Sequence, residues 1–269
     1  MRKLSNVVLA FLFSFAFMQQ SAMAFDQAYT HGEELTFKLY YNSAITGNVT
    51  AGKMVAKVQQ SPVIKGGKSL THIVLEGETK GAFRWFFKAN DRYETYVETK
   101  TQLPYYFKKR IQEGGYEASS DVVFTQENGK IRVQNNRSQS VRDFKTEHQV
   151  QDLLSVLYFI RNYDFEGITL NQKFEVNLFM DDSVYQIQFE FTGYEEIKTS
   201  LGYTRCLKFA PHVLTGGVFA DETPMTIFVS DDKNRLPILA EGDLMIGRAR
   251  IELVSFSGLA NVSSAISSR

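Results

Sequence analysis

The chain has 269 residues, and its 30 lysines and arginines balance its 30 aspartates and glutamates. This lack of basic excess argues against a dedicated nucleic-acid binder, which would carry a basic face. Cys206 is the only cysteine, so the chain cannot form an internal disulfide bond.

Residues 1–24 have the layout of a cleaved secretory signal peptide. A positive start is followed by an apolar run over residues 7–18 and by the small-residue triplet Ala22-Met23-Ala24. We expect cleavage between Ala24 and Phe25. No segment has the length and apolarity of a transmembrane helix, and Cys206 is too far from the cleavage site for N-terminal lipidation. We therefore expect residues 25–269 to form a single, soluble, periplasmic domain.

Most of the mature chain is predicted to form β-strands. Apolar and polar residues alternate, most clearly over residues 174–180 and 185–191, and a period of two indicates a strand with one buried face. The alternation around Cys206 places this residue in a strand as well. The other predicted strands cover residues 34–41, 49–58, 69–79, 93–98, 103–111, 122–124, 131–133, 225–230, 236–244 and 248–255.

Short polar or glycine-rich segments separate these strands. Asn128-Gly129 predicts a two-residue hairpin turn, because both residues tolerate positive φ. The pairs Asp181-Asp182 and Asp231-Asp232 could suggest calcium ligands, but the loop spacing that calcium requires is absent, so we predict turns. Three glycine pairs mark further bends, at residues 66–67, 114–115 and 216–217.

One segment departs from the strand pattern. Between Asp152 and Asn162, apolar residues recur at helical spacing, and Asp152 can cap the start of the helix. A helix this apolar must be covered, so we expect it to pack against the concave face of a sheet. The predicted fold is mainly β: one curved antiparallel sheet, or half-open barrel, wrapped around one central helix at about residues 152–162.

Two segments of the chain have similar sequences. Tyr96–Pro104 and Phe228–Pro237 each contain the end of a strand, a polar turn and a Leu-Pro pair that starts a second strand. Proline is tolerated at a strand start because its missing amide need not join the ladder. The two hairpins are predicted to occupy equivalent places in the two halves of the chain, with chance similarity as the alternative.

The sequence contains no catalytic signature. The histidines at positions 31, 72, 148 and 212 are scattered, and none belongs to a zinc-type pair. No nucleophile elbow, phosphate loop or dinucleotide-binding motif occurs. We therefore expect a protein that is not an enzyme and that has no catalytic residues, no metal and no cofactor.

Aromatic residues gather at residues 83–87, which include the only tryptophan, Trp85. One interpretation is a corner of the core, where residues 80–82 let the chain turn inward. The other is the lining of a groove for a lipid or another apolar ligand. Because adjacent residues on a strand cannot all face one side, part of this apolar surface must meet a second layer, a cavity or a partner. Residues 105–107 pose the same question.

The chain resembles the exported family called domain of unknown function 3108. The resemblance follows nearly the whole mature chain in order and implies no catalytic residues, because the family name records no activity. It rests on Gly32–Phe37, Trp85–Lys88, Asp91–Glu94, Gln151–Ser155 with Tyr158 and Arg161, Asp181–Tyr185, Cys206–Phe209 and Ile227–Asp232.

A hairpin near the C-terminus adds a second resemblance. Residues 227–239 are similar to a hairpin of periplasmic carriers of lipoproteins and related lipid-binding proteins. That resemblance implies a curved, incomplete antiparallel barrel in which a helix or loop plugs an apolar cavity.

Two function hypotheses follow, with an uncharacterised enzyme as a third. The first is a non-enzymatic carrier that binds a lipid, another hydrophobic small molecule or a lipidated partner in its concave face. The second is a structural or assembly protein of the cell envelope that binds a protein partner through sheet edges and exposed aromatics. The candidate ligand-lining residues are Phe83, Trp85, Phe86, Phe87, Tyr105, Leu153, Leu157 and Ile160.

Overall fold

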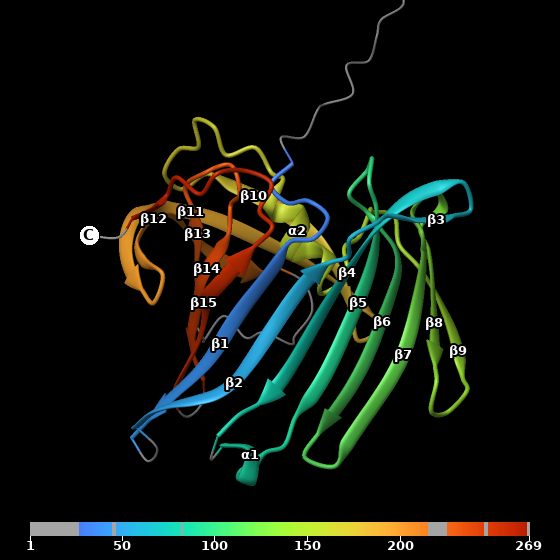
Figure 1. Ribbon diagram of the computed structural model, residues 1–269. Coiled ribbons are helices and arrows are strands. Elements are labelled where there is room, and N and C mark those ends of the chain that lie inside the picture. Colours follow the sequence, from blue (N-terminus) through green and yellow to red (C-terminus); the bar gives the residue numbers. More distant parts are fainter. Residues whose placement is uncertain (1–26, 45–46, 82, 215–224, 245–246, 268–269) are drawn as a thin grey trace, which may run out of the picture.

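The computed structural model describes residues 27–44, 47–81, 83–214, 225–244 and 247–267 (Figure 1). The predicted signal peptide and the predicted bend at residues 216–217 lie outside these ranges. All strands of the described residues belong to one antiparallel sheet. The elements are β1 (Glu34–Ser43), β2 (Gly47–Val58), β3 (Val63–Lys65), β4 (Lys68–Thr79), α1 (Phe83–Phe86), β5 (Asn90–Glu98), β6 (Pro104–Glu113), β7 (Tyr116–Thr125), β8 (Lys130–Asn135), β9 (Val141–Lys145), α2 (Ser155–Arg161), β10 (Lys173–Met180), β11 (Ser183–Thr199), β12 (Gly202–Val213), β13 (Met225–Ser230), β14 (Pro237–Asp243), β15 (Arg248–Ser257) and β16 (Ile266–Ser267).

The sheet consists of two meanders that are joined in the middle. Its order is β10-β11-β12-β13-β14-β15-β1-β2-β4-β5-β6-β7-β8-β9, so β15 near the C-terminus pairs with β1 near the N-terminus. The two ends of this order, β9 and β10, are consecutive strands in the sequence. The chain between them therefore crosses from one edge of the sheet to the other, and α2 lies on that crossing (Figure 1).

The predicted fold, a curved antiparallel sheet around one helix, is confirmed. The helix begins at Ser155, later than predicted, because Asp152 organises a turn ahead of it. The Asp152 Oδ1 atom accepts hydrogen bonds from the backbone amides of Leu154 and Ser155, both at 2.8 Å. This is the side-chain capping expected of an aspartate before a helix. The helix lies toward one end of the curved sheet and not at its centre (Figure 1).

Every predicted strand overlaps an observed strand, and no predicted range extends more than one residue beyond the observed one. Most observed strands are longer than predicted, because pairing extends into residues without clear alternation. Sequence patterning missed β3, β9 and β16, which have three, five and two residues. Segments this short contain too few alternating positions to show a period of two.

The tight turns follow backbone chemistry. The residue pairs 66–67, 114–115 and 181–182 all have positive φ and connect adjacent strands directly, which is the geometry of a two-residue hairpin turn. The two-residue turn predicted at Asn128-Gly129 is wrong. Residues 126–129 form a four-residue connection that begins with a 3₁₀ turn. Gly129 is needed there because an added Cβ would lie 1.9 Å from the carbonyl oxygen of Thr146.

The second aspartate pair also forms a turn, as predicted. The Asp232 carboxylate accepts hydrogen bonds from the amides of Asn234 and Arg235 through Oδ1, and from Ser264 and Ala265 through Oδ2. Both carboxylate oxygens are therefore engaged by backbone amides, which accounts for the position of this residue without a metal ion.

The aromatic segment forms a short helix that points outward. Residues 83–86 are α1, at the end of the sheet away from α2 (Figure 1). The core corner that was one interpretation of the sequence is wrong for Trp85, whose side chain is 89% exposed. The Phe83 ring packs toward Tyr41 of β1, with 6.2 Å between ring centroids, and the Phe87 ring lies over Gly114. Trp85 lies between these two anchors and faces solvent.

We expect Gly129→Ala to lower the free energy of unfolding by about 3 kcal/mol, because it adds a backbone clash to a positive φ. Gly67→Ala is the matched control: φ is also positive, but an added Cβ meets nothing within 4 Å. Its expected loss is about 1 kcal/mol. Urea unfolding measures both variants, and equal losses would contradict the assigned clash.

Candidate apolar binding site

A buried ion pair holds α2 in place. The Arg161 guanidinium donates to the Glu33 carboxylate from Nη1 (2.6 Å) and Nη2 (2.7 Å), and its remaining contacts go to the carbonyl oxygens of Ala28 (2.9 Å) and Asn234 (3.1 Å). Both charged side chains are almost completely buried. Burial alone would lower the pKa of Arg161, but the neighbouring Glu33 raises it above its ordinary value.

Polar contacts around this ion pair connect the N-terminal segment and α2 to the loop between β5 and β6. The Tyr29 hydroxyl donates to Gln102 Oε1 (2.6 Å), and Asn162 Nδ2 donates to the same oxygen (2.9 Å). The side-chain Oδ1 atom of Asn162 accepts from the backbone amide of Ala28 at 2.9 Å. The rings of Tyr29 and Tyr158 flank the guanidinium of Arg161, with ring centroids 5.5 Å and 5.2 Å away. The N-terminal segment, α2 and the β5–β6 loop are therefore joined in one network of hydrogen bonds.

The two hairpins with similar sequences have the same local geometry. Gln102 and Arg235, each two residues before the proline, both have positive φ, and each hairpin contains a register shift. The bond from the Glu98 amide to the Leu103 carbonyl corresponds to the bond from Ser230 to Leu236, both 2.9 Å long. Gln102 bonds to Asn162, and Arg235 donates to the carbonyls of Arg161 and Tyr163. The two equivalent hairpins thus hold the C-terminal end of α2.

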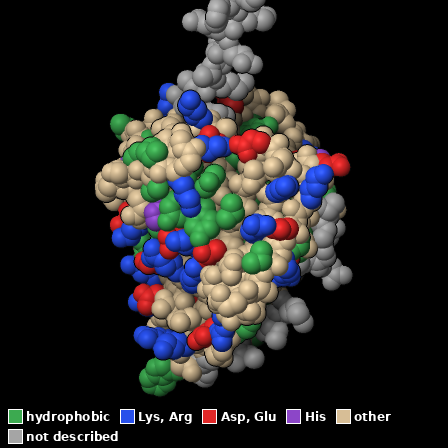
Figure 2. Space-filling model, turned by 90° about the vertical axis from the view of Figure 1, so that its right-hand side faces the viewer, with side chains coloured by type: hydrophobic (Ala, Val, Ile, Leu, Met, Phe, Trp, Pro, Cys, Tyr) green, Lys and Arg blue, Asp and Glu red, His purple; other side chains and the backbone are tan. Residues whose placement is uncertain are grey.

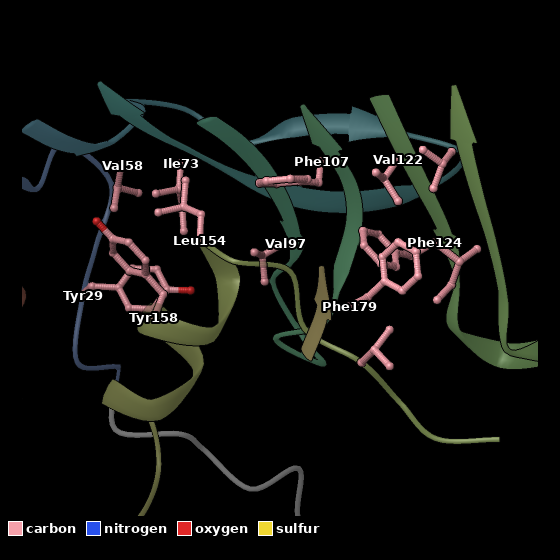
Figure 3. Packing of buried hydrophobic residues seen from close by; sticks show 13 residues of the cluster. Tyr29, Val58, Ile73, Val97, Phe107, Val122, Phe124, Leu154, Tyr158 and Phe179 are labelled. Atoms are coloured by element: carbon pink, nitrogen blue, oxygen red, sulfur yellow. The ribbon is translucent and has the colours of Figure 1, made fainter. Parts of the chain in front are cut away.

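Two faces of α2 are covered by the two halves of the sheet. Leu154 and Tyr158 pack into a cluster with residues of β2 and β4–β8 and with Phe179 of β10 (Figure 3). Val156 packs into a second cluster with residues of β10–β13. A third face carries Leu153 and Leu157, which stay 37% and 47% exposed, next to the partly buried Ile160. The third face is apolar but not covered.

The inward side chains of the strands are also incompletely buried. Near α2, inward residues such as Ile73 and Val97 are fully buried. Further along the same strands, toward α1, the next inward apolar residues are only half-buried, as at Leu75 and Tyr93. The change recurs from strand to strand: Phe37 to Leu39 on β1, Ala56 to Met54 on β2, Phe107 to Ile111 on β6, Leu253 to Ile251 on β15.

We call Leu39, Met54, Leu75, Tyr93 and Ile251 the half-buried interior residues. Sequence analysis placed them on strands but did not single them out as a site. Alternation identifies the inward face of a strand, yet it does not reveal how far a helix elsewhere in the chain covers that face. The signal that could have found them is the length of the strands compared with the single short helix.

Polar groups accompany the half-buried residues in the first half of the sheet. Burial raises the pKa of Tyr93 to about 12, and the acidic groups of Asp91, Glu113 and Asp181 add to the effect. Lys109 on β6 binds Asp181 in the β10–β11 turn at 2.6 Å. Arg142 on β9 binds Asp182 in the same turn. This turn therefore attaches the second half of the sheet to the first through side chains.

The structure does not bring the sequence-predicted lining residues together. Leu153, Leu157 and Ile160 lie on or next to α2. Phe83, Trp85 and Phe87 lie in or beside α1, and at about 3.3 Å per residue β5 carries that segment roughly 15–20 Å from the level of α2. Tyr105 lies at the start of β6, with the Lys65 ammonium 5.8 Å from its ring centroid. Phe86 belongs to α1, but its side chain is outside the described part of the structure. Contact of any of these residues with a ligand stays a prediction.

Other polar clusters in the described residues have a structural explanation. His72 on the outer face bonds to Glu94 (2.9 Å) and stacks on Tyr96, with 4.1 Å between ring centroids. Burial lowers the pKa of His72, so the neutral ring is favoured. Cys206 is buried, and burial raises the pKa of its thiol to about 12, which disfavours the reactive thiolate. Within the described ranges, no group of three His, Cys, Asp or Glu side chains could hold a metal ion.

A family model matches residues 36–254, from β1 to β15. The chain belongs to the DUF3108 family. The description of this family is "Protein of unknown function", and no curated protein matches the chain. The resemblance stated from the sequence is therefore confirmed, and the family gives no activity.

Solved structures resemble the DUF3108 chain in fold. A beta-barrel-like protein of the DUF1849 domain family from Brucella abortus is 10% identical, has a TM-score of 0.57, and matches over 86% of this chain and 99% of its own. A "putative lipoprotein" from Parabacteroides distasonis is 11% identical with a TM-score of 0.34, covering 85% and 96%. A "putative exported protein with YmcC-like fold" from Bacteroides fragilis is 11% identical with a TM-score of 0.29, covering 85% and 97%. The first likeness supports a barrel-like fold.

None of the helices in the described ranges of the DUF3108 chain is long and apolar enough to cross a bilayer.

We expect Glu33→Gln to lower the unfolding free energy by about 3–5 kcal/mol, because Arg161 would stay buried and charged without its partner. Glu34→Gln is the control from the adjacent position: Glu34 pairs with Lys57 on the surface, and the expected loss is below about 1 kcal/mol. Chemical denaturation measures both variants. A Glu33→Gln loss as small as that of the control would contradict the structural role of the pair.

Asp152 gives a prediction on pH. Burial raises the pKa of its carboxyl to about 6, against the hydrogen bonds from Thr95, Leu154 and Ser155. Between about pH 4 and 6 the folded state then binds more protons than the unfolded state, so this group lowers stability as pH rises through that window. Asp152→Asn removes the effect and keeps the hydrogen-bonding shape. We expect the variant to gain about 2–3 kcal/mol relative to wild type from pH 4 to pH 7, measured by urea unfolding. A difference that stays constant with pH would contradict the shift.

Proposed function

We propose that this DUF3108 protein is an exported, periplasmic, non-enzymatic protein that binds a lipid, another apolar ligand or a lipidated partner in its concave face. The observation that carries the proposal is the half-buried interior, where apolar side chains on five strands are left partly exposed. The apolar face of α2, with Leu153 and Leu157, supports it. We assign the ligand to the concave face of the sheet, against the half-buried interior residues.

The energetics favour an apolar occupant. Apolar area that stays in contact with water contributes nothing to folding, whereas covering it yields about 25 cal/mol per Å² before ordering costs. Side chains such as Leu39, Met54 and Ile251 offer no hydrogen-bonding groups, so recognition would come from area and shape. The hydroxyl of Tyr93 provides a polar contact for the head of an amphipathic molecule.

The test is uptake of a fluorescent fatty acid by the purified protein. Met54→Trp fills the interior and is expected to weaken binding about tenfold or more. Val123→Trp is the matched control, because Val123 is on the outer face of β7 and is 38% exposed. Native mass spectrometry of protein purified from its own host shows whether a lipid co-purifies. The proposal is wrong if no lipid co-purifies and wild type takes up no fatty acid.

The second candidate is an envelope assembly protein, favoured by one observation. β9 is the last strand in the sheet order, and Val141 on it is 50% exposed. A partner strand could add to this edge through backbone hydrogen bonds. Crosslinking from position 141 in the periplasm discriminates the two candidates: a defined protein adduct, together with a failure to take up fatty acid, favours assembly.

A further inference from the structure

The short helix α1 exposes a tryptophan to solvent. Trp85 is 89% exposed, while the flanking Phe83 and Phe87 are anchored against Tyr41 and over Gly114. The Phe87 amide bonds to the Phe83 carbonyl (2.9 Å), and the neighbouring Lys80 amide bonds to Ala51 (3.0 Å). A side chain this large is seldom left in water, so its exposure between two neighbours that contact the sheet points to a partner.

Two basic residues next to Trp85 have no opposite charge bound to them. Arg84 and Lys88 are exposed, and neither makes an ion pair within the described residues. Both line a recess of about 370 Å³ between α1 and the β6–β7 turn. Asn90 and Gln112 are in the same lining and add polar donors.

Two of the three carboxylates that line this recess are engaged by cations. Glu78 binds Lys80 at 2.6 Å, and Glu117 binds Arg137 at 2.5 Å. Burial and the neighbouring Asp91 raise the pKa of Glu113 above its ordinary value. The surface beside Trp85 is therefore suited to an anion.

Further apolar side chains are exposed at the same end of the sheet. Tyr116 (63%) starts β7, Met225 (40%) starts β13, and Leu244 (51%) follows β14. The strand registers place all three ends on the side of α1 and opposite α2. Figure 2 shows hydrophobic side chains projecting at the bottom of the molecule, the end at which α1 lies in Figure 1, with lysines and arginines above them.

We propose that the α1 end is a docking surface for a lipid bilayer that contains anionic lipids. Trp85 enters the headgroup region, where tryptophan is favoured because its ring is amphipathic. Arg84 and Lys88 bind the lipid phosphates. A bilayer fits better than a protein groove, since the exposed side chains lie at the ends of separate strands and in α1, and a flat partner can meet them together. Docking of this kind does not require that the interior binds a ligand.

The sole tryptophan makes the test specific, because all tryptophan fluorescence comes from position 85. Vesicles of phosphatidylethanolamine with one-quarter phosphatidylglycerol are expected to shift the emission to shorter wavelength and to protect it from acrylamide quenching. Vesicles of phosphatidylcholine alone should do so far less. Inorganic phosphate at millimolar concentration should leave the emission unchanged, which separates a bilayer from a free anion.

Vesicle flotation measures the variants. Trp85→Ser is expected to weaken binding about tenfold, the equivalent of partly burying one large apolar side chain. Removing both cations in Arg84→Ser with Lys88→Ser is expected to weaken binding to anionic vesicles about fivefold per residue, less at high salt. Arg132→Ser with Lys145→Ser, on β8 and β9, is the charge-matched control and should bind like wild type.

The proposal is overturned if anionic vesicles leave the emission of Trp85 unchanged, or if Trp85→Ser floats as well as wild type. Equal binding of both vesicle types would overturn the role of the two cations. Fatty-acid uptake is measured on the same variants: loss of flotation with normal uptake separates this proposal from the ligand-binding one, and normal flotation without uptake separates them in the other direction.

Discussion

The ion pair between Arg161 and Glu33 is the interaction on which the arrangement of this fold depends. The chain must cross from β9 to β10, and these strands are the two ends of the sheet order. A helix on that crossing could take several positions on the concave face. Arg161 removes this freedom, because one guanidinium binds the N-terminal segment, the β13–β14 loop and Glu33 together. Buried charges are tolerated only when they are fully paired, so the three segments must come together in one geometry.

With α2 held at one end of the sheet, the inward side chains toward α1 are less covered, because the helix is much shorter than the strands. α2 has seven residues and spans about 10 Å, whereas β1 and β2, with ten and twelve residues, span roughly 35 Å. No helix of this length can cover every inward side chain of such strands. Two of the buried clusters include residues of α2 or the residue before it, whereas a third is formed by strands alone, with Met54, Leu75 and Ile251 partly buried at its margin. The interior has a closed polar end and a less covered apolar end.

The sequence predicted the positions of the strands and the helix α2 better than it predicted which of their side chains are buried. Alternation identified the strands because a half-buried strand has to alternate. The two hairpins could be paired from their polar turns and Leu-Pro pairs, and the structure shows that Gln102 and Arg235 both have positive φ. The direction of α1 could not be predicted, since it is set by contacts with Tyr41 and Gly114 that lie far away in the sequence. The eight predicted lining residues were chosen because they are apolar. Apolarity does not show where a side chain points, so it does not separate the solvent-exposed Trp85 from Leu157 on the face of α2.

The two proposals meet at one end of the molecule. The half-buried interior residues lie toward α1, and the exposed side chains that suit a bilayer surround the same end. An acyl chain that passes through water exposes each methylene at a cost of about 0.8 kcal/mol. A protein that docks with its less covered end on a bilayer would shorten that exposure, because the chain could move from lipid to protein interior directly. The end that contains α2 would then face away from the membrane. The polar network around Arg161 and Glu33 at that end has no apolar surface for an acyl chain to bind.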